Sequence, residues 1–82
     1  MSNTRDEKTL IEFGLHFKEI RKKKKVSLRK LESIAEVDHS EIHRIEKGLR
    51  NPSLTTLLAL SDALGVDICD LLRFRETPSV SK

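Results

Sequence analysis

Residues 37–48 read Val37-Asp38-His39-Ser40-Glu41-Ile42-His43-Arg44-Ile45-Glu46-Lys47-Gly48, and their spacing predicts a short helix from about Ser40. At about 100° per residue, the side chains of such a helix divide into two faces. One face is polar and holds His39, Ser40, His43, Arg44 and Lys47. The two isoleucines fall on the opposite face. Hydrogen-bond donors along one side of a helix suit the reading of base edges in the major groove of DNA.

Apolar side chains recur at helical spacing in residues 8–24, which predicts a long helix before this stretch. They are Leu10, Phe13, Phe17 and Ile20. Lys25 then has to turn the chain without the glycine that commonly follows a helix. The polar residues 1–7 are expected to form a flexible N-terminal segment.

Capping residues predict where the remaining helices begin and end. The side chains that can accept hydrogen bonds from a first helical turn are Ser27, Asp38, either Asn51 or Ser53, and Asp67. Glu41 stands at the capping-box position after Asp38. Gly48 and Gly65 stand where the third and fourth helices are expected to end. With no alternating strand pattern, we predict an all-α domain over residues 8–74 and a flexible tail over residues 75–82.

Length and composition limit the class of protein. The 82 residues suffice for one small domain. The single cysteine, Cys69, excludes an internal disulfide, and no metal-ligand spacing or cofactor fingerprint occurs, so we expect neither a metal nor a cofactor. A catalytic constellation is also lacking, which argues against an enzyme. No apolar run suits a signal peptide or a membrane span, so we expect a cytoplasmic protein with no membrane partner.

Positive charge is concentrated in residues 18–30. This segment holds eight basic residues and one acid, a net charge of +7 in a chain whose total is +3, so the remainder carries −4. Such a cluster suits a polyanion such as nucleic acid. A solvated, lysine-rich helix end explains the charge as well, so charge alone does not decide the function.

Several short motifs occur together at the spacing of one known family. They are Val26-Ser27-x-x-x-Leu31, Val37-Asp38, Ile42-x-Arg44-Ile45-Glu46-Lys47-Gly48 and Arg50-Asn51-Pro52-Ser53-Leu54. On these motifs, residues 13–73 resemble the helix-turn-helix domain of the Cro/C1 repressor family, also called the Xre family. The resemblance implies a compact five-helix, lambda-repressor-like DNA-binding domain, with the helix-turn-helix formed by its second and third helices.

The resemblance also implies which side chains meet DNA. The third helix would be the recognition helix, with His39, Ser40, His43 and Arg44 facing the major groove. Arg44 suits paired hydrogen bonds to guanine O6 and N7. The residues expected to grip the DNA backbone are Lys24, Lys25, Ser27, Arg29, Lys30, Lys47, Arg50 and Asn51. The two histidines are also explained as surface residues without a ligand, and a metal site on this pair lacks a third ligand.

Three positions depart from the family pattern. Leu28 stands where many relatives carry a glutamine that bonds a phosphate and a recognition-helix side chain, so this anchor is lost or replaced by Arg29 or Ser27. Glu32 replaces a small alanine, and it either leans outward or pairs with a nearby base such as Arg29. Glu36 replaces a glycine. The packing of the second helix on the third is therefore not assumed to match that of relatives.

Two further contacts are expected. The resemblance implies an ion pair between Arg21 and Glu46 that joins the first and third helices. A homodimer is expected because it places two recognition helices one helical turn of DNA apart, about 34 Å. The fifth helix and Phe74 are the expected dimer surface, although Phe74 can equally fold back on the core.

The leading hypothesis is sequence-specific binding of double-stranded DNA by a small transcriptional regulator, a repressor or controller on a palindromic operator. The chain is similar in size to restriction–modification controllers, prophage repressors and antitoxins, and no small-molecule effector is expected. The alternative is a protein-interaction role, as an antitoxin that binds a toxin or as a bridging coactivator. RNA binding is disfavoured because aromatic stacking platforms for single strands are missing.

Overall fold

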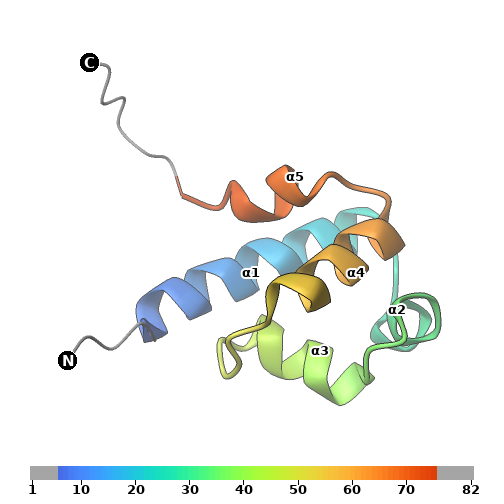
Figure 1. Cartoon of the computed structure of the whole chain (residues 1–82), viewed down its shortest axis with the longest axis horizontal. Helices are drawn as coiled ribbons and strands as arrows, with labels where there is room; N and C mark the ends of the chain where they lie inside the picture. Colours follow the sequence, from blue (N-terminus) through green and yellow to red (C-terminus); the bar gives the residue numbers. More distant parts are fainter. Residues whose placement is uncertain (1–5, 76–82) are drawn as a thin grey trace.

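Five α-helices make up the part of the chain that the computed structural model describes, residues 6–75 (Figure 1). They are α1 (Glu7–Lys23), α2 (Leu28–Ala35), α3 (His39–Glu46), α4 (Leu54–Leu64) and α5 (Ile68–Leu72). No strand occurs within these residues, and the predicted all-α class is confirmed. The helix predicted from residue 8 begins at Glu7 because Asp6 caps it. Most of the two segments predicted to be flexible, 1–7 and 75–82, lies outside the described residues.

Each helix begins at a side chain that accepts a hydrogen bond from the backbone of its first turn. These N-caps are Asp6, Ser27, Asp38, Ser53 and Asp67. Of the two candidates for α4, Ser53 is the cap, since its hydroxyl oxygen accepts from the Thr56 N–H at 3.2 Å. An N-cap of this kind stabilises a helix by about 1 kcal/mol. Local side-chain chemistry therefore sets where all five helices start.

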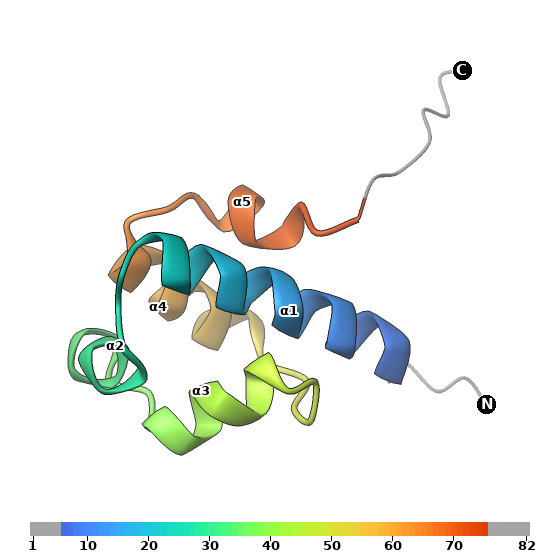
Figure 2. The same cartoon turned by 180° about the vertical axis from the view of Figure 1, so that it is seen from behind.

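α1 is the central helix of the fold. In both views, α5 lies along one side of α1 and α3 along the opposite side, with α2 at one end of α3 (Figures 1 and 2). Every helix contributes to one core, whose buried residues include Phe17, Leu31, Ile42, Ile45, Leu60 and Leu71. Among the described residues, no helix is long and apolar enough to cross a membrane. The arrangement leaves the outer face of α3 uncovered by other helices.

α1 and α3 cross in close contact at Gly14. A Cβ atom at Gly14 would lie 2.5 Å from the carbonyl oxygens of Ile45 and Glu46 and 2.8 Å from the carbonyl carbon of Glu46. Because these are backbone atoms, only a shift of one helix could make room for a side chain. Gly14 therefore sets the distance between the central helix and α3.

Two turns are made by residues other than glycine in the left-handed region. Lys25, after α1, has φ 61°, and Glu36, between α2 and α3, has φ 59°. An L-residue in this conformation costs roughly 1–2 kcal/mol. Gly48 and Gly65 adopt φ 78° and 71° after α3 and α4, as predicted. The turn between α2 and α3 is thus held in a conformation that its own residue disfavours.

Replacing Glu36 with glycine is expected to stabilise the domain by about 1 kcal/mol, because glycine adopts the left-handed region without a steric penalty. In a domain of this size, that change corresponds to a melting temperature about 4–8 °C higher. Ser33→Gly, at an exposed helical position of α2, is the matched control and is expected to lower the melting temperature. Thermal unfolding followed by circular dichroism gives both melting temperatures. Equal shifts of the melting temperature in the two variants would contradict the assignment of strain to Glu36.

Candidate nucleic-acid interface

α3 presents a polar face to solvent and an apolar face to the core. Ile42 and Ile45 are buried, whereas His43 and Arg44 are exposed. Lys47 continues the exposed face after the helix. The division into two faces predicted from the sequence is therefore present in the structure.

Asp38 holds the first turn of α3. Its Oδ1 accepts from the backbone N–H and from the hydroxyl of Ser40, each at 3.0 Å. These two hydrogen bonds hold the pKa of the Asp38 carboxyl below its usual value. Because the folded-state pKa is lowered, the cap stabilises α3 above the unfolded-state pKa, and this effect is lost as pH falls through the folded-state pKa. The hydroxyl proton of Ser40 is committed to the cap, so its oxygen is left as an acceptor.

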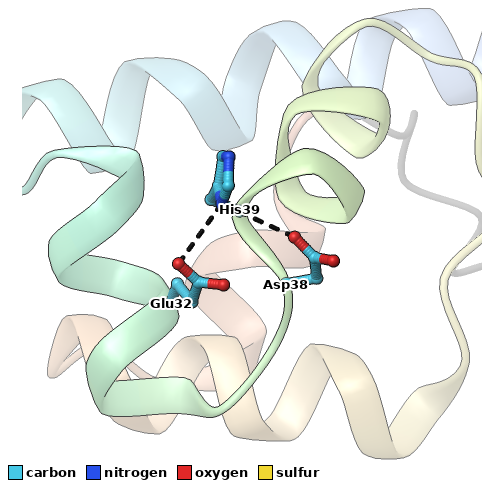
Figure 3. Close-up of side chains that lie close together, drawn as sticks. All are labelled: Glu32, Asp38 and His39. Carbon is cyan, nitrogen blue, oxygen red and sulfur yellow. Dashed lines mark hydrogen bonds and ion pairs between the residues drawn. The ribbon is translucent and has the colours of Figure 1, made fainter.

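His39, at the other side of the same turn, is joined to α2 by Glu32. Its Nδ1 lies 3.2 Å from Oε1 of Glu32 and 3.5 Å from Oδ1 of Asp38 (Figure 3). Of the two arrangements considered from the sequence, Glu32 thus adopts the second, pairing with a nearby base, but that base is His39 rather than Arg29. Leu28 packs against the core and offers no polar group to α3. The polar link between α2 and α3 is made by Glu32 instead.

The same three side chains are the ones that could hold a metal ion within the described residues. The ligand atoms of Glu32, Asp38 and His39 all lie within 4.8 Å of one another. Two of these groups already have partners, since Asp38 caps α3 and Glu32 lies at hydrogen-bonding distance from His39. Hydrogen bonds without an ion account for this arrangement.

The residues predicted to contact DNA phosphates lie at both ends of α3. The α1–α2 connection and α2 stand at one end, and the α3–α4 connection stands at the other (Figures 1 and 2). All eight predicted residues are exposed: Lys24, Lys25, Ser27, Arg29 and Lys30 at the first end, and Lys47, Arg50 and Asn51 at the second. The exposed face of α3 is thus flanked by groups that can bind a polyanion.

Glu41 lies between two of the arginines on this surface. Its Oε1 accepts from Nε of Arg50 at 3.1 Å and lies 3.9 Å from Nη1 of Arg44. Glu41, at the capping-box position, therefore takes part in an ion-pair cluster with Arg44 and Arg50. Solvent-exposed pairs contribute about 0–1 kcal/mol each, so both arginines can leave Glu41 for a stronger anion.

A protein-family model described as Helix-turn-helix matches residues 17–71. The chain belongs to the Cro/C1-type helix-turn-helix family. α2 and α3 are the two helices of the motif, as the sequence resemblance implied.

Two solved structures of regulators resemble this helix-turn-helix protein. The restriction-modification controller protein C.AhdI from Aeromonas hydrophila is 33% identical with a TM-score of 0.76, over 78% of this chain and 97% of that chain. The clp gene regulator ClgR from C. glutamicum is 26% identical with a TM-score of 0.73, over 78% and 83% of the respective chains. No curated protein sequence matches the chain significantly. The family and both structures confirm the predicted fold and support DNA-binding transcriptional regulation.

A buried ion pair joins the first and third helices of the helix-turn-helix domain. Nη2 of Arg21 donates to Oε1 of Glu46 at 3.1 Å, and Nε donates to Oε2 at 2.5 Å. Nη1 of Arg21 also donates to the carbonyl oxygen of Val26 at 2.8 Å. Arg21 is therefore not part of the exposed positive charge, although it was counted in the basic segment 18–30. The other seven basic residues of that segment are exposed.

The C-terminal end of the described chain folds back on α1. Phe74 packs edge-on against Phe13, with ring centroids 5.6 Å apart and an interplanar angle of 79°. Nη2 of Arg75 donates to Glu12 Oε1 at 2.6 Å and to Thr9 Oγ1 at 2.9 Å. Of the two alternatives for Phe74, packing on the core is the one observed. Arg75 is in contact with α1, although it was assigned to the flexible tail.

Proposed function

We propose that this protein is a cytoplasmic transcriptional regulator that binds a palindromic operator in double-stranded DNA as a homodimer. One observation carries the proposal: the exposed polar face of α3 lies between two groups of exposed phosphate-binding candidates. Base contacts from such a helix specify sequence, and phosphate contacts on either side set its register in the groove. The controller C.AhdI and the regulator ClgR, which this domain resembles, support a regulatory role.

The side chains divide into two roles under this proposal. Base edges are contacted by His39, Ser40, His43 and Arg44. Phosphates are contacted by Lys24, Lys25, Ser27, Arg29, Lys30, Lys47, Arg50 and Asn51. Arg44 contributes the most specific contact, because a guanidinium can donate two hydrogen bonds to one guanine.

The dimer surface is proposed on the α5 side of the domain. Leu72 is 49% exposed and borders a groove that is also lined by Leu10, Phe13, Leu57 and Phe74. Phe74 therefore packs on Phe13 and at the same time forms one wall of the groove on this surface. A symmetric dimer through this surface would present two α3 helices to half-sites about 34 Å apart.

Arg44→Ala is expected to relax base preference at one position of each half-site, at a cost of about 1–3 kcal/mol. Lys24→Ala is the matched control, because it removes one exposed cation outside α3. It is expected to weaken binding to all sequences alike and to reduce the slope of log K against log salt by about 1. Selection of binding sites from random duplex DNA, followed by affinity measurements over a salt series, provides the test.

A palindromic motif is the expected outcome of the wild-type selection. If no motif is recovered and both variants bind DNA like the wild type, the proposal that α3 reads the DNA sequence is wrong. That result would favour the protein-interaction role, which the comparisons do not support.

A further inference from the structure

The contact between Glu32 and His39 determines which ring nitrogen of His39 carries a proton. Oε1 of Glu32 lies 3.2 Å from Nδ1, and Oδ1 of Asp38 lies 3.5 Å from the same atom. An ionised carboxylate can only accept hydrogen bonds. Both carboxylates therefore favour a proton on Nδ1, in the neutral ring as well as in the charged one.

The second nitrogen of the ring, Nε2, is left with its lone pair when His39 is neutral. It lies at the end of the ring away from both carboxylates (Figure 3). It has no hydrogen-bond partner among residues 6–75, and the side chain is 35% exposed. Neutral His39 is thus a hydrogen-bond acceptor at the first turn of α3.

An acceptor at this place distinguishes bases by their amino groups. In the major groove, adenine offers N6–H₂ and cytosine offers N4–H₂ as donors, whereas guanine and thymine present acceptors. We propose that Glu32 is a positioning residue: in the neutral ring of His39 it keeps Nε2 as an acceptor, which makes α3 prefer adenine or cytosine at the base that His39 meets. This inference rests on the proposed function, since it assigns the base preference of one recognition residue.

His16 provides a contrast within the same molecule. Its Nε2 lies 2.7 Å from the carbonyl oxygen of Asp70, which can only accept, so Nε2 of His16 carries a proton. The two histidines are therefore expected in opposite tautomers. Each one serves as an internal reference for the other in a single spectrum.

The tautomers can be measured in the free protein without DNA. Long-range ¹H–¹⁵N correlation spectra should be recorded at a pH where imidazoles are neutral, first without and then with EDTA. We expect His39 to show a protonated Nδ1 and an unprotonated Nε2, and His16 to show the reverse. In Glu32→Gln, the His39 signals should shift towards the Nε2-protonated form, because a neutral amide can donate to Nδ1 as well as accept from it. Glu36→Gln removes a charge from the end of α2 without touching His39 and should leave the signals unchanged.

Binding-site selection with the same variants tests the reading role. Glu32→Gln is expected to reduce the preference for adenine or cytosine at one position by about 3–10-fold, the worth of one hydrogen bond, and to leave the other positions unchanged. Glu36→Gln should retain the wild-type motif. Thermal melts of both variants establish that they remain folded.

Each outcome decides a separate question. A wild-type His39 with a proton on Nε2, or one whose signals change on adding EDTA, would overturn the assignment of Glu32. A motif with guanine or thymine at the His39 position, or one unaffected by Glu32→Gln, would overturn the reading role. Failure of the wild type to select any duplex DNA would contradict the proposed function itself, whereas the tautomer spectrum would still judge the Glu32–His39 contact.

Discussion

Replacing Gly14 with alanine is expected to destabilise the domain by about 3 kcal/mol, although alanine is the better helix former by about 1 kcal/mol. The new Cβ atom would lie 2.5 Å from two carbonyl oxygens of α3. Backbone atoms cannot rotate away as a side chain can, so α1 and α3 must separate. Chemical denaturation followed by circular dichroism would show the loss as a lower midpoint.

Gly65→Ala is the control for this prediction. Gly65 has φ 71°, which favours glycine, but no atom beyond Gly65 and its two chain neighbours lies within 4 Å of a Cβ placed there. Its replacement is expected to cost about 1 kcal/mol through backbone strain alone. If Gly14→Ala left the free energy of unfolding unchanged or raised it, the close contact between α1 and α3 at Gly14 would be contradicted.

Glu46→Ala is expected to destabilise the domain by about 3–5 kcal/mol, because it leaves the charge of Arg21 buried without a partner. Only 8% of Arg21 and 4% of Glu46 is exposed, so solvent cannot replace the lost carboxylate. In a domain of this size, the loss corresponds to a melting temperature lower by about 12 °C or more. A thermal melt of each variant measures this directly.

Glu41→Ala is the matched control, since Glu41 forms ion pairs on the surface with Arg50 and Arg44. Exposed pairs contribute about 0–1 kcal/mol, so this variant should melt close to the wild type. Equal effects of the two substitutions would contradict the structural role of the buried pair. The double replacement Arg21→Met with Glu46→Leu should recover part of the loss, because no buried charge remains. Recovery should be incomplete, because the Val26 carbonyl loses the donor that Arg21 supplies.

Much of the fold could be predicted because its signals are local. Ser27, Asp38 and Asp67 cap helices as expected, and the choice between Asn51 and Ser53 was open only because both are good caps. Helical periodicity likewise placed Ile42 and Ile45 in the core. These features depend on neighbours within a few residues, so no knowledge of the tertiary fold was required.

The features that sequence reasoning missed depend on contacts between helices. Gly14 was not singled out from the sequence, and only the backbone of α3 explains why a glycine stands inside α1. Glu32 is seven residues from His39, and the two meet because of the angle between α2 and α3. A glycine among helical apolar positions was the one signal that could have indicated the first contact. For Glu32, the replacement of a small residue indicated a change but not its partner.

The left-handed conformation of Glu36 makes the shape of the DNA-reading unit a property of the whole domain. If the turn residue were one that adopts the left-handed region without strain, the turn alone would hold α2 and α3 at their angle, independently of the core. Here the turn opposes that angle by roughly 1–2 kcal/mol, so packing on α1 and α4 has to maintain it. The angle between α2 and α3 is thereby coupled to the packing of the core. Substitutions far from DNA that loosen the core are thus able to lower affinity while the protein is still folded.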